Sequence, residues 1–442
     1  MNNRIFGRSS SAVLPKAITG DGCYLIDTNG KRYFDGSGGA AVSSLGHGHA
    51  KIRAALHRQL DQLPYAHTSF FTSQPAEDLA DKLIAHSPQG IDWVYLVSSG
   101  SEAVEAALKL ARQYFTEIDQ PDRYRIIARR QSYHGNTLGA LSAGGNAWRR
   151  QKFKPLLIDT THIAPCYEYR DRLADETAFE YGQRVANQLN TEIERLGPET
   201  VMAFIAEPVV GATTGAVPPV KGYFKRVREI CNQYGILLIL DEVMCGMGRT
   251  GSLFACEQES ISPDIVTIAK GLGAGYQPIG AMLCSDRIFS AIRDGSGFFQ
   301  HGQTYLGHPM AAAASVAVLD ILLNDNLLAE VTEKGEKLAA ALHVALGNHQ
   351  NVGDLRGRGL LRGIELVANR DNKAPFDPTK MVHKQIKQAA FELGLLCYPM
   401  GGTLDGRYGD HILLAPPFII SDAEIDYLVA LIQQSIETVL PS

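Results

Sequence analysis

The sequence predicts an α/β fold, with a large domain built on a mostly parallel sheet and a smaller α+β domain after it. Short runs of branched apolar residues alternate with helical patterns through the middle of the chain, as in parallel strands joined by helices. These runs are apolar throughout, as expected for a sheet covered on both faces. Gly supplies 43 of the 442 residues, which favours many tight loops beside a ligand.

The predicted elements begin with a hairpin, Tyr24–Ile26 and Lys31–Phe34, that turns at Asn29-Gly30. Apolar runs of strand length follow at Trp93–Val97, Ile126–Ala128, Val201–Ala206, Ile236–Leu240 and Ile265–Ala269. Helical spacing predicts helices at Ser101–Phe115, Met310–Leu323 and Leu328–Leu346. The last part has predicted strands at Leu360–Leu366, Gly394–Tyr398 and His411–Ala415, and a final helix from Asp422.

We expect three regions, because the pattern changes from roughly Pro309 onward. Residues 1–50 form an N-terminal segment that packs with the small domain. Residues 51–310 form the large domain, and residues 311–442 form the C-terminal small domain.

The composition excludes several classes of protein. Hydrophobic residues make up 45% and charged residues 20%, unlike disordered, collagen-like or coiled-coil chains. The net charge is -5 and no basic stripe stands out, so we expect no nucleic-acid partner.

The seven cysteines contain no C-x-x-C pair, so we expect reduced, buried thiols and a cytoplasmic protein. The longest apolar stretch, Met310–Leu319, is too short to span a bilayer, and we expect no membrane partner. Metal binding has little support, since His47-Gly-His49 is too short for a helical ligand pair.

Three predicted strands end in charged residues, Glu207, Asp241 and Lys270. In parallel α/β sheets, ligands gather outside the carboxyl ends of the strands. One such residue usually starts a loop, whereas three on the same edge indicate a site.

Lys270 and Asp241 each have two interpretations. Lys270 precedes a run rich in glycine, and a lysine beside a cofactor can form an imine and move a proton. It fits a solvated lysine at a loop entrance equally well. Asp241 ends an apolar run, and a buried carboxylate needs a positive partner. That partner is a pyridinium nitrogen, or Asp241 is a helix cap or part of an ion pair.

The predicted helix from Ser101 has a small, Gly-containing start, and Ser99 and Glu102 have capping-box spacing. Free amides at such a start bind anions, although many helices begin this way. Beside a lysine and an aspartate, the start suggests a phosphorylated cofactor. Tyr133 is a candidate for stacking on a ring and Thr304 for donating to a phosphate, and each also suits an ordinary structural role.

Taken together, these segments resemble the class III aminotransferases, which are pyridoxal 5'-phosphate enzymes of fold type I. The resemblance runs over nearly the whole chain and is strongest at the long Asp241–Gly251 block with its downstream lysine. It is carried by Gly20–Asp27, Tyr33–Gly39, Ser99–Ala103, Tyr133–Gly135, Glu207-Pro208, Asp241–Gly251, Ala269–Gly271, Gln303–Tyr305 and Leu414–Pro417.

The resemblance implies roles for these residues and makes 51–310 the cofactor-binding domain. Lys270 would hold the cofactor covalently and move the proton in the 1,3-shift, and Asp241 would pair with the pyridinium nitrogen. The remaining cofactor contacts would be Tyr133 and Val243 on the two ring faces, Gly100 and Ser101 at the phosphate, Glu207 supporting the network near Asp241, and Thr304 at the neighbouring subunit's phosphate. A homodimer or tetramer with its sites at the subunit interface is implied.

The substrates are implied less directly. Family members that use 2-oxoglutarate usually carry an acidic residue five positions after the Glu of Glu-Pro, and Ala212 stands there in this chain. This resembles the branch that moves an amino group from an ω-amine or ω-amino acid to pyruvate. Arg407 would clamp a carboxylate with its planar fork. Ala41 suggests a roomy pocket, which Tyr65, Phe70 or Phe71 would partly fill.

Several other readings remain open. Diaminononanoate synthesis, 2-oxoglutarate-dependent transamination, an aminomutase, a racemase and a dialkylglycine decarboxylase share the cofactor residues. A nicotinamide-dependent dehydrogenase would need G-x-G-x-x-G between a strand and a helix, and Gly271–Tyr276 lacks the last glycine. A binding protein without catalysis would have lost Lys270 or Asp241, and both are present.

Overall fold

The computed structural model describes residues 4–9 and 13–441. A seven-stranded sheet in the order β4-β10-β9-β8-β7-β5-β6 forms its centre. Only β10 runs antiparallel to its neighbours, β4 and β9, so the predicted mostly parallel sheet is confirmed. Its strands are β4 (Trp93–Val97), β5 (Arg125–Arg129), β6 (Thr160–Ile163), β7 (Val201–Ala206), β8 (Leu237–Asp241), β9 (Ile265–Ile268) and β10 (Gly280–Cys284).

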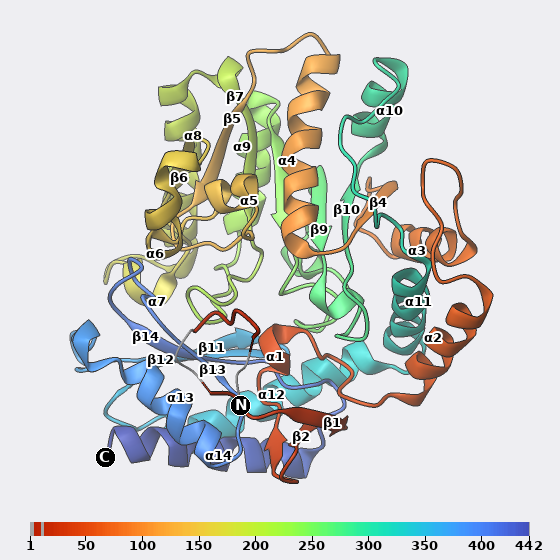
Figure 1. Cartoon of the computed structure of the whole chain (residues 1–442). Helices are drawn as coiled ribbons and strands as arrows, with labels where there is room; N and C mark the ends of the chain where they lie inside the picture. The colour runs from red at the N-terminus through yellow and green to blue at the C-terminus, as the bar shows by residue number, and fades with distance from the viewer. Residues whose placement is uncertain (1–3, 10–12, 442) are drawn as a thin grey trace.

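Helices cover both faces of this sheet (Figure 1). Phe204 of β7 and Leu238 of β8 belong to one apolar cluster with α8 (Ala178–Leu196) and α9 (Tyr223–Tyr234). The alternate residues, Ile205 and Ile239, belong to a second cluster with α4 (Gly100–Glu117). Because successive side chains of a strand point to opposite faces, burial on both faces explains the unbroken apolar runs of β7 and β8.

The C-terminal part lies below the carboxyl ends of the parallel strands (Figure 1). Its antiparallel sheet has the order β11-β12-β14-β13. Helices α12 and α13 pack against this sheet, and α14 packs against both of these helices. The bounds are α12 (Leu327–Leu346), β11 (Val352–Arg358), β12 (Leu361–Leu366), α13 (Val382–Glu392), β13 (Tyr398–Gly401), β14 (Asp410–Leu414) and α14 (Asp422–Val439).

The N-terminal strands contact this C-terminal part, and the predicted hairpin is present. They are β1 (Ala17–Asp21), β2 (Tyr24–Asp27) and β3 (Arg32–Phe34). The Phe34 amide donates to the Gly394 carbonyl at 2.7 Å, and the Leu396 amide donates to the Phe34 carbonyl at 2.8 Å. These contacts agree with the expected packing of residues 1–50, and the division into three regions stays a prediction.

The remaining helices connect these layers. Helix α11 packs against α2 and α3 at the right of Figure 1. The bounds of all the remaining helices are α1 (Gly38–Ala41), α2 (Ala50–Gln62), α3 (Gln74–Ala85), α5 (Leu138–Ala143), α6 (Ala147–Arg150), α7 (Glu168–Asp171), α10 (Asp286–Asp294) and α11 (Pro309–Asn324).

The predicted strand at Gly394–Tyr398 is wrong in position, because β13 begins at Tyr398. Residues 394–396 are apolar for a different reason, since they pair with β3, and Leu395 is buried there. The sequence analysis did not predict β1, β6, β10 or β11. Strand β6 has only four residues, and β10 follows the glycine-rich loop directly.

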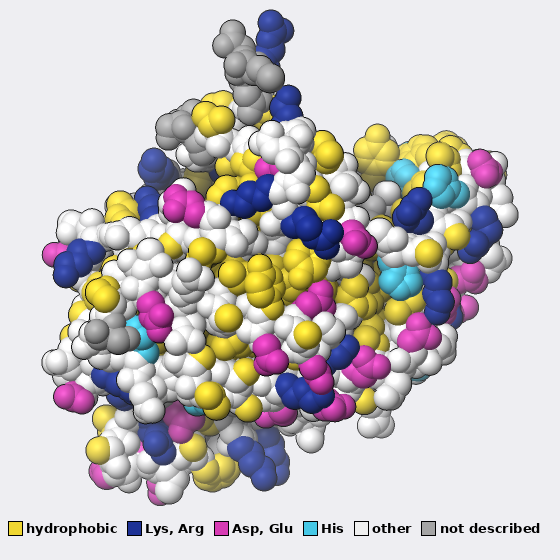
Figure 2. Space-filling model, turned by 90° about the horizontal axis from the view of Figure 1, so that it is seen from below, with side chains coloured by type: hydrophobic (Ala, Val, Ile, Leu, Met, Phe, Trp, Pro, Cys, Tyr) yellow, Lys and Arg dark blue, Asp and Glu magenta, His cyan; other side chains and the backbone are white. Residues whose placement is uncertain are grey.

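The lower face of the molecule carries hydrophobic side chains interspersed with basic and acidic ones (Figure 2). Within the described ranges, no single helix is long and apolar enough to cross a membrane. Helices α11 and α12 reach that threshold only when joined, and they meet at a bend of 70°. All seven cysteines are free and buried.

Candidate active site

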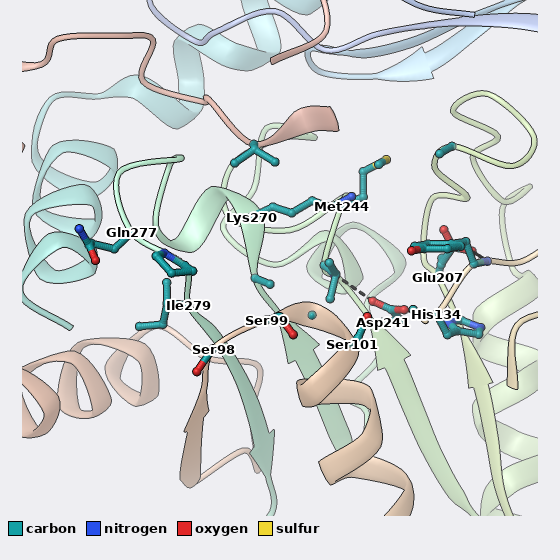
Figure 3. Close-up of a pocket in the computed structure, with 18 residues that line it drawn as sticks. Ser98, Ser99, Ser101, His134, Glu207, Asp241, Met244, Lys270, Gln277 and Ile279 are labelled. Atoms are coloured by element: carbon teal, nitrogen blue, oxygen red, sulfur yellow. Dashed lines mark hydrogen bonds and ion pairs between the residues drawn. The ribbon is translucent and has the colours of Figure 1, made fainter. Parts of the chain in front are cut away.

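A cavity of about 260 Å³ lies at the carboxyl ends of the parallel strands, against the N-terminus of α4 (Figure 3). Every residue that the sequence indicated for the cofactor lines it, with the exception of Thr304. They are Gly100, Ser101, Tyr133, Glu207, Asp241, Val243 and Lys270.

Lys270 follows β9 and extends its side chain into this cavity (Figure 3). Its backbone has a φ of 46°, in the left-handed region, and such a conformation costs a non-glycine residue about 1–3 kcal/mol. Burial lowers the pKa of its amine to about 8, although the carboxylates of Asp241 and Glu207 act in the opposite direction. A lysine with this pKa is neutral and nucleophilic in a much larger fraction at neutral pH than an ordinary lysine.

Asp241 ends β8, and its side chain is almost fully buried. One carboxylate oxygen accepts from the Val243 amide at 3.0 Å, and the other lies 2.7 Å from Nδ1 of His134. Nε2 of His134 is buried without a hydrogen-bond partner among the described residues. Asp241 is thus oriented by two neighbours within a pocket where a buried negative charge favours a positive ligand.

Glu207 joins two loops that border the cavity. Its carboxylate accepts from the Tyr133 amide at 3.0 Å and from the Gly211 amide at 2.9 Å. Burial raises the pKa of this carboxyl, and His134 acts in the opposite direction. Glu207 therefore sets the position of Tyr133 through its backbone.

The start of α4 forms an anion-binding geometry. Ser99 is the N-cap, and its hydroxyl accepts from the Glu102 amide at 3.3 Å. A Cβ on Gly100 would lie 2.7 Å from a methyl carbon of Val243. Since real Cβ atoms do not approach so closely, glycine is needed here for the helix start to meet Val243. The unbonded amides of an 18-residue helix then face the cavity and favour a negative group.

These residues fit a phosphorylated aromatic ring with a basic nitrogen. The anion site at α4, the oriented carboxylate of Asp241 and the amine of Lys270 lie around one cavity, and Tyr133 and Val243 supply an aromatic and an aliphatic wall. Together they offer a partner for each charged part of such a group, and an apolar surface for its ring.

The far wall of the cavity depends on the C-terminal sheet. Arg356 of β11 donates to the Gly215 carbonyl at 2.8 Å, and Nε2 of His411 lies 3.0 Å from the Ala212 carbonyl. Ala212 lines the cavity, and Ala41 is buried in the same apolar cluster with a φ of 61°. Ala212 therefore lines the cavity, whereas Ala41 belongs to the same apolar cluster without lining it.

Thr304 and the predicted pocket residues Arg407, Ala41, Tyr65, Phe70 and Phe71 lie outside this lining. Arg407 stands on an exposed turn at a neighbouring groove. Thr304 is exposed, and its carbonyl accepts from the Tyr65 hydroxyl at 2.9 Å. Tyr65 also meets the Tyr305 ring edge-on. Within one chain, Thr304 and Tyr65 do not line the cavity that contains Lys270.

The sequence analysis missed His134 as a partner of Asp241, and it missed Met244 and Gln277–Ile279 as lining residues. Tyr133-His-Gly was noted, but nothing local indicates that His134 meets a carboxylate 107 positions away. Gln277–Ile279 follow the glycine run after Lys270, and that adjacency was the available signal.

Comparison with known proteins agrees with this geometry. Residues 6–436 match the family model for class-III aminotransferases. A protein of Schizosaccharomyces pombe, described as an uncharacterized aminotransferase, is 44% identical over 98% of this chain and 95% of its own length. An (S)-enantioselective ω-transaminase from Thermomicrobium roseum is 36% identical, covers 97% of this chain and 93% of that one, and superposes with a TM-score of 0.91.

The ω-transaminase from Pseudomonas jessenii in complex with PMP is 31% identical and superposes with a TM-score of 0.91. The match covers 96% of this chain and 93% of that chain.

Proposed function

Because this chain belongs to the class-III aminotransferases, which depend on pyridoxal 5'-phosphate, we propose that it moves an amino group from an ω-amine or ω-amino acid to pyruvate or a related 2-oxo acid. The predicted enzyme class, an aminotransferase, and the predicted cofactor, pyridoxal 5'-phosphate, are both confirmed. The observation that carries the choice of substrates is Ala212, which lines the cavity where 2-oxoglutarate users usually have an acidic side chain. The likeness to ω-transaminases supports the same choice.

When bound, pyridoxal 5'-phosphate supplies an electron-withdrawing ring that weakens the C–H bond beside the transferred amino group. Lys270 would hold the cofactor, and its Nζ would take and return the proton. Asp241 would hold a proton on the ring nitrogen, and His134 keeps the Asp241 carboxylate in place. Gly100 and Ser101 would hold the phosphate, Tyr133 and Val243 would enclose the ring, and Glu207 positions Tyr133.

We also propose a homodimer in which Thr304 completes the phosphate site of the partner subunit. Thr304 is exposed and lies away from its own cavity. The loops around it expose large apolar side chains, Phe70, Phe71, Phe298 and Tyr305, and such surfaces commonly mark protein interfaces.

The proposal predicts a reversible half-reaction. An ω-amine without an α-carboxylate, added to holoenzyme without oxo acid, should remove the visible absorbance of the lysine-bound cofactor. Pyruvate should restore it, and 2-oxoglutarate should restore it at least about tenfold more slowly, because a wrongly accommodated carboxylate costs at least 1.4 kcal/mol. Stopped-flow absorbance measures both steps. Absorbance that stays constant with every such amine would contradict the proposal and favour an α-amino acid substrate, a decarboxylase or a mutase.

The lowered pKa of Lys270 predicts a pH dependence for cofactor capture. Only the neutral amine attacks the aldehyde, so below the pKa of about 8 the rate should rise about tenfold per pH unit and then level off. Stopped-flow mixing of the apoenzyme with pyridoxal 5'-phosphate between pH 6 and 10 gives this profile. N-α-acetyllysine is the control, and its rate should still be rising at pH 10. An enzyme profile that follows acetyllysine would show that Lys270 has an ordinary pKa.

A further inference from the structure

Four buried polar side chains lie behind the cavity, between the large sheet and the C-terminal sheet. None of them lines the cavity, and none is more than 4% exposed. Two follow strands of the large sheet and two belong to the C-terminal part. We call them the polar network, and they are Gln131 after β5, Thr213 after β7, Thr403 after β13 and His411 in β14.

Gln131 ties the segment of Tyr133 to the C-terminal part. Its side-chain nitrogen donates to the carbonyls of Gly402 and Thr403 at 2.6 and 3.0 Å. Its own carbonyl accepts from the Thr213 hydroxyl. Its φ of 58° is in the left-handed region, which a residue with a side chain occupies only when its surroundings fix it there. The position of Tyr133, two residues later, therefore depends on these distant partners.

His411 completes the polar network behind Ala212. Nδ1 of His411 lies 2.7 Å from the Thr403 hydroxyl, and Nε2 lies 3.0 Å from the Ala212 carbonyl. Because a carbonyl only accepts, Nε2 carries the hydrogen, and Nδ1 accepts from the hydroxyl. This arrangement requires a neutral ring, and burial together with the charge of Arg356 lowers the pKa of His411 to about 4. Both nitrogens of a neutral imidazole are thus used.

The loop that carries Ala212 lies directly on the His411 ring. A Cβ on Gly215, at the end of this loop, would lie 2.6 Å from Cδ2 of His411. At its start, the loop is joined to Tyr133 by the Glu207 carboxylate, which accepts from both segments. Within the described ranges, no buried nitrogen or oxygen of the polar network lacks a partner. The walls of the cavity formed by Tyr133 and Ala212 are therefore held at a fixed spacing.

We propose that His411 is a positioning residue for the substrates. Its Nε2–H group holds the Ala212 carbonyl, and Thr403 and Gln131 connect this bond to the segment that carries Tyr133. A displacement of about 1 Å at a reacting centre can lower a rate by about 10²-fold, so the spacing of these walls affects turnover. The inference rests on the proposed function only for the identity of the amine and the oxo acid.

Two substitutions of His411 test the role of its Nε2–H group. His411→Gln keeps an N–H group at about the reach of Nε2, whereas the shorter His411→Asn reaches only about as far as Nδ1. Stopped-flow half-reactions should show kcat/KM at least about tenfold lower in His411→Asn for both the ω-amine and pyruvate, because the buried Ala212 carbonyl loses its donor. His411→Gln should stay within about threefold of the wild type.

The cofactor gives the readout that a general loss of structure would change. The Kd of pyridoxal 5'-phosphate and its absorbance maximum should be the same in both variants as in the wild type, because Asp241 and Lys270 belong to the other sheet. Wild-type kcat/KM in His411→Asn, equal losses in both variants, or a loss matched by weaker cofactor binding would overturn the proposal.

A second pair of variants changes the network with little change of shape. Thr403→Val removes the hydroxyl and should lower kcat/KM at least about fivefold, whereas Thr403→Ser keeps it and should restore the rate. The control is Ser435→Ala, which removes a buried hydroxyl that donates to the Leu431 carbonyl at 2.6 Å within α14. An equal loss in this control, or no recovery in Thr403→Ser, would contradict the proposal.

Amide hydrogen exchange of the holoenzyme without substrate separates this inference from the proposed function. The amides of Gly215 and Ala216 donate to the Gly211 carbonyl, so their exchange reports opening of the loop. Residues 211–216 and 130–135 should both exchange at least about fivefold faster in His411→Asn than in His411→Gln. A response in neither segment, or in 211–216 alone, would overturn the connection through Thr403 and Gln131.

The two proposals can therefore fail separately. If both segments respond and the wild type turns over no ω-amine, the positioning role is supported and the proposed function is refuted. If the wild type turns over ω-amines and neither segment responds, the positioning role alone is refuted.

Discussion

Substitution of Lys270 by alanine is expected to abolish multiple turnover, with a loss of at least about 10⁴-fold, the upper range for a positioned acid–base group. Lys270 carries the only lysine amine that lines the cavity formed by the described residues. Its replacement removes both the covalent anchor of the cofactor and the group that moves the proton. Steady-state rates with an ω-amine and pyruvate measure the loss.

Borohydride reduction followed by peptide mass spectrometry gives a second readout for the same variant. In the wild type, reduction should fix the cofactor on the peptide that contains residue 270, and in the variant it should not. Lys225→Ala, at an exposed position of α9, is the control and should behave as the wild type. Sustained turnover by Lys270→Ala would remove the catalytic assignment.

Substitution of Asp241 by asparagine should lower kcat by about 10²–10³-fold, the usual loss when one oriented charge is removed from a reacting centre. The amide has the size of the carboxylate but not its negative charge. It no longer stabilises a proton on the ring nitrogen, and it leaves His134, 2.7 Å away in the wild type, beside a neutral group.

Rates per bound cofactor measure the effect of Asp241→Asn, and the visible spectrum reports the protonation of the ring. Asp21→Asn, at an exposed position of β1, is the control and should leave kcat unchanged. A kcat for Asp241→Asn within threefold of the wild type would show that this carboxylate is not the partner of the ring nitrogen.

The sequence predicted seven residues that line the cavity, because the signals for these residues are local. Asp241 and Lys270 each end an apolar run, and a parallel sheet brings the carboxyl ends of its strands to one edge. The start of α4 has its own capping pattern at Ser99 and Glu102. Each of these features can be read within a few residues.

The remainder depends on contacts between distant segments. His134 contacts Asp241, which is 107 positions away in the sequence. The position of β13 was predicted wrongly because residues 394–396 are apolar for pairing with β3. Hydrophobic periodicity indicates that a residue is buried, but it does not indicate which segment packs against that residue.

The hydrogen bond from Arg356 to the Gly215 carbonyl joins two segments that the ribosome synthesises at different times. The two residues are 141 positions apart, so the ribosome needs on the order of ten seconds to add the later one after the earlier. Strands β8, β9 and β10, which complete the sheet with Asp241 and Lys270, are synthesised within that interval, while the loop around Ala212 has no C-terminal strand to hold it until β11 is added. The nascent chain therefore contains Asp241 and Lys270 before it contains the C-terminal strand that supports the loop around Ala212.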